Sequence, residues 1–331
     1  MHNGGHSYII VSHSKDKQVC YMIKDISNLQ VKLQTLLAAQ QAFYTQGKVA
    51  DYIPALAEVS PEKMAVCVST IDGKTIGAGD YQEAFSIQSI SKVFGLVMAM
   101  NRIGDDLWQR VNMEPSGQPF NSIIQLEWEK GIPRNPVINA GALLVADVLT
   151  SHFSSSKLAF LSFMRSLAHE DSIHVDNHVY QSELAHGSRN AALGYLMKSF
   201  GNIESEIPEV LSHYFTQCSV AMSCEQLATS LLFLANKGID PVSKEAICTP
   251  RDAHRVNAIL STSGMYDQSG EFAFSIGLPA KSGVGGGVIA IVPNYGVICT
   301  WSPPLNSFGN SVIGTNLVAN LAQELGLSIY H

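Results

Sequence analysis

The chain has 331 residues, enough for one large domain or for two, with a substantial core in either case. Hydrophobic residues make up 46% and charged residues 15%, and the net charge of −7 comes without a basic block, so nucleic acid and anionic membranes are poor partners. No apolar run approaches the roughly 18 residues that a membrane-spanning helix needs.

The first 21 residues are polar, and we expect them to form a leader, ordered or disordered, outside the folded domain at 22–331. Their single apolar run, at 8–11, is too short for the core of a signal peptide. We therefore expect a cytoplasmic protein, which is not the setting of an exported cell-wall enzyme.

Cysteine and histidine show no metal-binding spacing. The six cysteines are scattered without a C-x-x-C motif, which predicts buried, reduced thiols. The eleven histidines are dispersed as well. His169, His174 and His178 lie close in sequence, but in a polar, loop-like stretch that favours solvated side chains. We expect no metal site.

The N-terminal part of the domain is predicted to contain a helix and a β-hairpin. Apolar residues at helical spacing indicate an amphipathic helix over 26–44. A connector at 47–56, which carries Tyr52, leads to strand-like runs at 64–70 and 75–79 that are joined by an Asp-Gly turn.

The middle of the chain, from 94 to about 250, is mostly helical by pattern. Clear helices are predicted near 140–149, 158–168, 190–200, 208–217 and 224–236. The last of these ends at Lys237-Gly238, a typical C-cap signal. A further helix is predicted over 252–260.

Strands return near the C-terminus, at 280–283, 288–293 and 297–302, and a helix over about 310–325 follows. Strands at both ends with helices between them predict an α+β fold. An antiparallel sheet flanked by the terminal helices would form one lobe, from about 22–85 and 255–331, and an inserted helical lobe would comprise about 86–254. The site is expected in the cleft between the lobes.

Ser89 and Lys92 form the first candidate for a catalytic pair, because residues three apart share one face of a helix. A lysine there can take the serine proton if burial lowers its pKa. Free N–H groups at the helix start would also favour developing negative charge. The Ser-x-x-Lys spacing recurs elsewhere in the chain, so by itself the pair is more simply read as exposed and polar.

A second stretch, at 277–287, makes the pair more informative. It holds Lys281-Ser282-Gly283, the only Lys-[Ser/Thr]-Gly of the chain, at the start of the C-terminal strands. An early Ser-x-x-Lys and a late Lys-[Ser/Thr]-Gly are typical of serine β-lactamases and penicillin-binding proteins. We therefore expect Ser89 at the start of the helical lobe and Lys281 at the sheet edge, facing one another.

Six motifs in order make the resemblance more specific. They are FSIQSISKV at 85–93, NPVINAGA at 135–142, SE and RN at 182–183 and 189–190, Tyr214 with QCS at 217–219, MYD at 265–267 with Gly270, and GLPAKSGV at 277–284. Together they resemble the serine-dependent glutaminase family in its bacterial form, over about 22–331. The resemblance implies a β-lactamase-like fold, hydrolysis of L-glutamine to L-glutamate and ammonia, no cofactor, and a homo-oligomer, dimer or tetramer.

The resemblance also implies roles for the two motifs that hold Ser89 and Lys281. Ser89 would attack the side-chain amide and form a γ-glutamyl ester, with Lys92 as general base. Lys281 would support the site by lowering the pKa of Lys92 further. The backbone N–H groups of Ser89 and Val284 would form the oxyanion hole, beside glycines that allow close approach of the substrate.

The other site residues implied by the resemblance are Tyr52, Asn139, Glu183, Asn190, Tyr214 and Tyr266. Glu183 would accept the substrate ammonium, and Asn139, Asn190 and Tyr266 would hold the amino-acid end. Tyr52 and Tyr214 would line the reacting end, where Tyr214 could pass a proton to the leaving ammonia. Read singly, these residues have simpler explanations, as an exposed carboxylate, helix N-caps and core aromatics.

Two rival functions are open at this point. A penicillin-recognising hydrolase shares the architecture, but its Ser-Asp-Asn motif is absent, and 214–216 occupies that region. An amino-acid-binding domain that senses glutamine without turnover would have no need of Ser89 and Lys92. The sequence offers no evident residue to activate the water that cleaves the ester, so a second role for Lys92 stays open.

Overall fold

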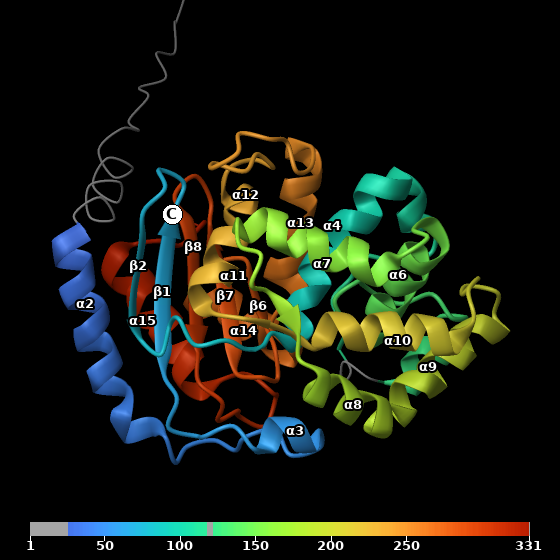
Figure 1. Cartoon of the computed structure of the whole chain (residues 1–331), viewed down its shortest axis with the longest axis horizontal. Helices are drawn as coiled ribbons and strands as arrows, with labels where there is room; N and C mark the ends of the chain where they lie inside the picture. Colours follow the sequence, from blue (N-terminus) through green and yellow to red (C-terminus); the bar gives the residue numbers. More distant parts are fainter. Residues whose placement is uncertain (1–25, 118–121, 331) are drawn as a thin grey trace, which may run out of the picture.

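The computed structural model describes residues 26–117 and 122–330, so the predicted leader at 1–21 lies outside the described residues. The described chain divides into a β-sheet with its covering helices and a group of helices at one side of it (Figure 1). The predicted α+β fold, an antiparallel sheet flanked by the terminal helices, is confirmed.

The main sheet has five antiparallel strands in the order β2-β1-β8-β7-β6. These strands are β1 (Ala65–Thr70), β2 (Thr75–Gly79), β6 (Ala280–Ser282), β7 (Gly287–Val292) and β8 (Gly296–Trp301). β1 pairs with β8, and Cys67 lies opposite Cys299, so the two ends of the chain meet in one sheet. The predicted hairpin and the three C-terminal strands are thus confirmed.

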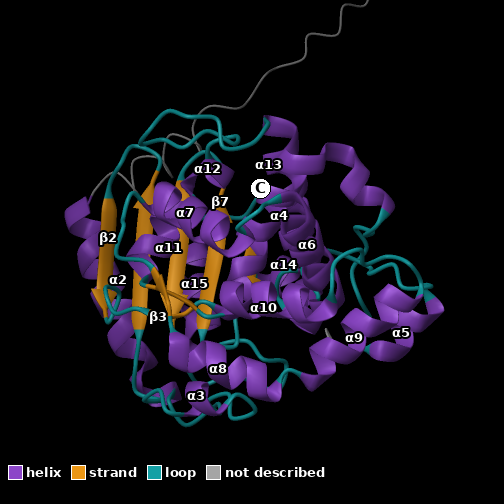
Figure 2. Ribbon diagram, turned by 45° about the vertical axis from the view of Figure 1, so that its right-hand side comes forward, coloured by secondary structure: helices purple, strands orange, loops and turns teal. Residues whose placement is uncertain are grey.

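Both faces of the sheet are buried, which explains why its strands read as continuous apolar runs. Val288, Ala290 and Val292 pack in a core with the helices α2 (Ile26–Ala39) and α15 (Val312–Leu325). The alternate residues, such as Ile289 and Ile291, belong to the core of the helical group. Figure 2 shows α11 (Cys224–Ser230) lying across the strands.

The remaining helices, most of them in the helical group, have these bounds: α3 (Pro54–Ala57), α4 (Ser91–Ile103), α5 (Ile123–Trp128), α6 (Asn139–His152), α7 (Ser156–Ala168), α8 (Asn177–His186), α9 (Ser188–Ser199), α10 (Ile207–Cys218), α12 (Leu232–Ala235), α13 (Pro250–Ser263) and α14 (Ser269–Ser275). Short 3₁₀ turns are η1 (Gln40–Phe43), η2 (Gln88–Ile90), η3 (Gly104–Gln109) and η4 (Tyr266–Gln268). The first ten residues of α4 are all buried, and α4 packs against α6 and α10. A helix buried on all sides belongs in a core.

In the described parts of the chain, no helix is long and apolar enough to cross a membrane.

Several predicted bounds are wrong in detail. The helix expected over 26–44 ends at Ala39 and continues as the 3₁₀ turn η1. The helix expected over 224–236 is two helices, because Leu231 leaves the helical conformation between them. The last helix begins at Val312 rather than near 310, where the Ser311 side chain accepts a hydrogen bond from Gly314 N and caps it.

Several elements near the site were not predicted, among them α3, which lies at the end of the segment expected to be a connector. A second sheet joins β3 (Phe85–Ser86), β5 (Val220–Met222) and β4 (His174–Val175) in the order β3-β5-β4. Helix α8 follows β4, in the polar stretch that was expected to be a loop. Helix α14 follows Tyr266. The small sheet brings the chain before Ser89 beside the end of α10, where Tyr214 lies.

Candidate active site

Ser89 lies in the 3₁₀ turn η2, between β3 and α4. It is buried, and it precedes the first α-helical residue, Ser91, by two positions instead of opening the helix as predicted. The residue before it, Gln88, has a φ of 49°, in the left-handed region that side chains avoid. Strain of this kind persists where the surrounding structure enforces it, and it is frequent beside reactive groups.

Gln88 is the site residue that sequence reasoning missed. It is buried, its Nε2 donates a 3.0 Å hydrogen bond to Ser86 Oγ, and its side chain is hydrogen-bonded to Glu183. Ser86 Oγ in turn donates to Cys218 O at 2.9 Å. The only signal in the sequence was its place next to Ser89, because a positive φ at glutamine is set by tertiary contacts.

Lys92 is held one helical turn further on, with only 1% of its surface exposed. Its Nζ donates to Asn139 Oδ1 at 2.8 Å and to Val137 O at 3.2 Å; within the described chain these are its hydrogen-bond acceptors, and Ser89 is not among them. Burial lowers the pKa of Lys92 to about 8, against a smaller opposing effect of Glu183. A substantial neutral fraction is therefore present near pH 7–8, as a general base requires.

Asn139, Asn190 and Tyr214 form a hydrogen-bonded group that joins α6, α9 and α10. Asn139 Nδ2 donates to Asn190 Oδ1 at 3.0 Å, and the Tyr214 hydroxyl donates to Asn139 Oδ1 at 3.4 Å. The N-cap interpretation of both asparagines is wrong, because Ile138 and Gly187 hold the cap positions. Burial raises the pKa of Tyr214 far above its usual value, so its hydroxyl stays protonated.

Glu183 lies on α8 and is buried, so the interpretation of it as an exposed loop carboxylate is wrong. Burial raises its pKa, while the hydrogen bond from Gln88 and the charge of Lys92 act in the opposite direction. A buried carboxylate is costly unless it is paired. Glu183 is therefore suited to bind a cationic ligand group.

Tyr266 and Lys281 lie together on another side of the candidate site. Tyr266 has a φ of 52°, and it is buried near the side chains of Ser89 and Ser282, which act against the rise in its pKa that burial causes. Burial raises the pKa of Tyr266 to about 12. Lys281 Nζ lies 4.5 Å from the centre of the Tyr266 ring and donates to Gly264 O at 3.0 Å and to Ser282 O at 2.6 Å. Burial, with a contribution from Lys92, lowers the pKa of Lys281 far below its usual value.

Val284 lies in the glycine-rich turn between β6 and β7, which packs directly on the Ser89 turn. A Cβ on Gly283 would lie 2.5 Å from Ile87 O and 3.3 Å from Ser89 N, and a Cβ on Gly285 would lie 2.2 Å from Ser86 O. Only glycine permits this approach. The packing brings the backbone around Val284 alongside Ser89, where an oxyanion hole would need it.

Tyr52 lies at the open side of the site. It is 56% exposed, yet its hydroxyl is close enough to Tyr266 and Glu183 for their charges to contribute to a raised pKa, which burial of the hydroxyl chiefly causes. The ring thus borders solvent while the hydroxyl is near buried groups. The structure brings all the predicted site residues to one region, from both the sheet and the helices.

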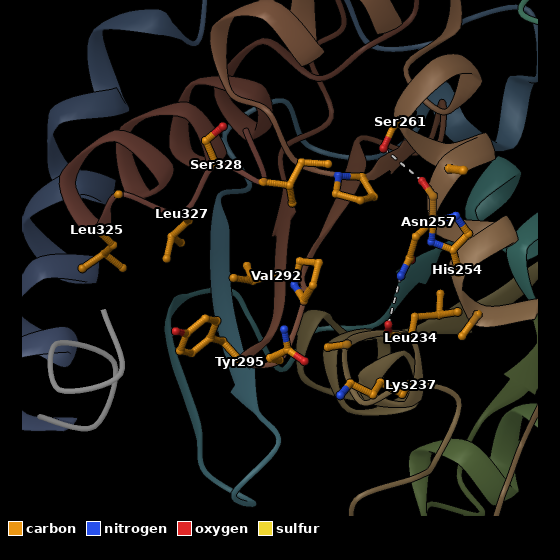
Figure 3. A pocket seen from close by; sticks show the side chains of 18 of the residues that line it. Leu234, Lys237, His254, Asn257, Ser261, Val292, Tyr295, Leu325, Leu327 and Ser328 are labelled. Carbon is orange, nitrogen blue, oxygen red and sulfur yellow. Dashed lines mark hydrogen bonds between the residues drawn. The ribbon is translucent and has the colours of Figure 1, made fainter. Parts of the chain in front are cut away.

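A large cavity of about 1020 Å³ lies elsewhere, between α12, α13 and the C-terminal residues after α15. Figure 3 shows Tyr295, Leu325 and Leu327 on one side of it and Lys237, His254 and Asn257 on the other. None of the predicted site residues lines it. The volume of a cavity therefore does not identify the candidate active site in this protein.

The described cysteines are buried thiols, and two of the histidines pair with carboxylates. Cys20 lies outside the described residues, and the other five cysteines are free and buried, as predicted. His169 pairs with Asp240 at 2.9 Å, and His178 pairs with Glu58 at 3.2 Å. Among the described residues, no group of three or more His, Cys, Asp or Glu side chains could hold a metal ion.

The chain is similar to known proteins over most of its length. The family model described as Glutaminase matches residues 47–330. The chain is 51% identical over 302 residues to the Glutaminase of Shewanella amazonensis, covering 91% of this chain and 99% of that protein. It is 52% identical over 299 residues to Glutaminase 1 of Yersinia pestis, covering 90% and 97%.

Solved structures match as well. The crystal structure of a probable glutaminase of Bacillus subtilis has a TM-score of 0.85 and 34% identity, covering 92% of this chain and 99% of that one. A covalent complex of a Bacillus subtilis glutaminase with 5-oxo-L-norleucine, formed by reaction with 6-diazo-5-oxo-L-norleucine, has a TM-score of 0.82 and 33% identity, covering 91% and 100%. This chain belongs to the glutaminase family.

Proposed function

We propose that this protein hydrolyses the side-chain amide of L-glutamine to L-glutamate and ammonia, with Ser89 as nucleophile and Lys92 as general base. The observation that carries the proposal is the packing of the Val284 turn on the Ser89 turn, with a buried lysine of lowered pKa one helical turn away. The covalent complex of the Bacillus subtilis relative supports a mechanism in which the enzyme bonds to the substrate carbon chain.

The first half-reaction forms an ester. Ser89 Oγ attacks the side-chain carbonyl carbon while neutral Lys92 takes the hydroxyl proton, directly or through a bound group. Negative charge develops on the amide oxygen, and the N–H groups of Ser89 and Val284 stabilise it; each such donor contributes about 3 kcal/mol in the transition state. The C–N bond then breaks as the proton that Lys92 took from Ser89 passes, through Tyr214, to the nitrogen. The nitrogen leaves as ammonia.

The second half-reaction returns the enzyme to its starting state. Water attacks the γ-glutamyl ester carbon, a base takes its proton, and the same N–H pair stabilises the tetrahedral intermediate. The ester C–O bond breaks, Ser89 regains its proton and glutamate leaves. We assign the base of this step to Lys92 also, because it is neutral again once its proton has left with ammonia.

The amino-acid end of the substrate requires its own partners. Glu183 is proposed to pair with the ammonium, while Asn139, Asn190 and Tyr266 hold the polar groups around it, and Tyr52 covers the open side. Buried groups that stay unpaired with the wrong ligand give a site its selectivity. No cofactor has a role in this scheme.

We also propose a cytoplasmic homo-oligomer, a dimer or tetramer. Support comes from exposed apolar side chains on the neighbouring helices α5 and α9, where Trp128 is 77% and Tyr195 58% exposed. Light scattering on the purified full chain measures the assembly directly, and a monomer at micromolar concentration would contradict this part of the proposal.

The mechanism is tested with Ser89→Ala. We expect ammonia release from glutamine to fall by at least about a thousandfold, with glutamine binding by calorimetry retained. Ser154→Ala is the matched control, because Ser154 and Lys157 have the same spacing on an exposed surface and should leave turnover unchanged. Turnover at the wild-type rate in Ser89→Ala would remove this serine from the mechanism.

A covalent probe separates the two rival functions. After treatment with 6-diazo-5-oxo-L-norleucine, the adduct should map by peptide mass spectrometry to the segment containing Ser89 and be absent from Ser89→Ala. Hydrolysis of a chromogenic β-lactam without ammonia release would favour a penicillin-recognising hydrolase. Binding of glutamine by the wild-type chain without turnover would favour a sensor.

A further inference from the structure

The segment that carries Tyr52 is attached to the rest of the protein at both ends. We call residues 48–57 the strap. At its start Lys48 N donates to Leu305 O and Leu305 N donates to Lys48 O, both at 2.9 Å. At its end the short helix α3 lies against α8, the helix that carries Glu183. Tyr52 lies between these two attachments.

Two polar contacts join the end of the strap to α8. Ala55 N donates a 3.3 Å hydrogen bond to Ser182 Oγ, which is partly buried. One turn earlier on α8, His178 pairs with Glu58, just beyond the strap; these two side chains are 65% and 67% exposed. Exposed ion pairs are screened by water and contribute little. Ser182 is therefore the sheltered polar contact between the strap and α8.

The strap packs through apolar side chains against α8, the Val284 turn and Leu305, but a cavity remains beside it. The cluster formed with it consists of Ala50, Ile53, Ala55, Leu56, Val179, Tyr266, Val284 and Leu305. A cavity of about 220 Å³, lined by Ala55, Leu56, Val179 and Val284 among others, adjoins the same elements. The exposed side chains of Glu58 and His178 also line this cavity, so it opens to solvent and the strap is not packed on all sides. A directional hydrogen bond has correspondingly more influence on where the strap lies.

We propose that Ser182 is a positioning residue that sets where Tyr52 stands relative to Glu183. Ser182 and Glu183 are consecutive on α8, so they project from the helix about 100° apart, one to the strap and the other to the site. A single helix thus holds both the carboxylate and the contact that places the tyrosine. This inference rests on the proposed function, because it takes Tyr52 and Glu183 as contacts of the substrate amino-acid end.

The first test is a split between KM and kcat. Ser182→Ala removes the acceptor for Ala55 N and should raise KM for glutamine about 3–10-fold, as the loss of one hydrogen bond implies, with kcat within about twofold of wild type. Ser182→Thr keeps the hydroxyl and should restore KM. Gln181→Ala, at an exposed neighbouring position, is the control and should behave as wild type.

The second test asks whether Ser182 acts through Tyr52. In a Tyr52→Ala background, Ser182→Ala should raise KM no further, because there is no longer a ring to place. The proposal would be overturned by an unchanged KM in Ser182→Ala, or by a fall in kcat as large as the rise in KM. An additive increase of KM in the double variant would overturn it too. If Tyr52→Ala itself leaves KM unchanged, the assignment of Tyr52 to the substrate fails as well, and that outcome is distinguishable from failure of the Ser182 contact alone.

Discussion

Lys92 Nζ donates a hydrogen bond of 2.8 Å to Asn139 Oδ1. The contact joins α4 to the first residue of α6 inside a buried region, and an amide oxygen accepts this bond without adding charge. Burial can therefore keep the pKa of Lys92 near 8 while the amine is held in a fixed place. A carboxylate in the same position would hold the amine equally well but would favour its charged form.

The pH dependence of catalysis should follow the protonation of Lys92. The neutral amine is the active form and predominates above its pKa, so kcat/KM should rise with pH, close to tenfold per unit well below pH 8, and level off above about 8. Initial rates of ammonia release between pH 5.5 and 9 measure this. A flat profile below pH 8 would contradict the role of Lys92.

Asn139→Asp tests whether the uncharged partner matters. The new carboxylate should raise the pKa of Lys92, because an opposite charge in contact favours the ammonium form. We expect the rising limb of the pH profile to move at least one unit to the alkaline side and activity at pH 7 to fall about tenfold or more. Asn139→Ala removes the amide without adding charge, and it should lose activity without that alkaline shift; equal shifts in both variants would point to a structural effect.

Much of the fold is readable from local pattern, and the reasons are specific. β7 and β8 are apolar runs joined by a short turn that holds Asn294, and their burial on both faces explains their continuous hydrophobicity. The helix predicted over 252–260 is present as α13, which begins two residues earlier at Pro250, where the Thr249 side chain accepts a hydrogen bond from Asp252 N. The family and the α+β fold, both predicted, are confirmed.

The parts that could not be predicted depend on distant contacts. α8 has little amphipathic pattern, and its buried residues include the charged Glu183, so helical periodicity was hidden. Strands of two or three residues, such as β3 and β4, are defined by pairing with β5 and have no local signal. The left-handed backbone of Gln88 and Tyr266 likewise reflects the surrounding structure, since local preference opposes it.

The stability of the helical group should depend strongly on Asp147. This carboxylate is fully buried, pairs with Arg110 at 2.6 Å, and accepts hydrogen bonds from Ser205 N at 2.8 Å and Glu204 N at 3.2 Å. Asp147→Ala removes the acceptor of the two backbone N–H groups and takes the buried carboxylate away from Arg110, which keeps Asn202 O and Glu204 as partners. It should lower the free energy of unfolding by about 3–5 kcal/mol in urea titrations. Glu204→Ala is the control, because its side chain pairs with the same arginine but is 62% exposed, and it should change stability by less than about 1 kcal/mol.

Gly283→Ala tests the proposed oxyanion hole without removing any polar group. A methyl group there would meet Ile87 O at 2.5 Å and Ser89 N at 3.3 Å, so the Val284 turn must move away from the Ser89 turn. We expect kcat to fall about 10²–10³-fold through loss of one aligned N–H donor, with unfolding destabilised by about 1–3 kcal/mol. Gly270→Ala is the matched control: this glycine lies in α14 with open space around it, so alanine should leave kcat unchanged and stability equal or slightly higher. Wild-type kcat in a folded Gly283→Ala protein would show that contact between the two turns is not needed for catalysis.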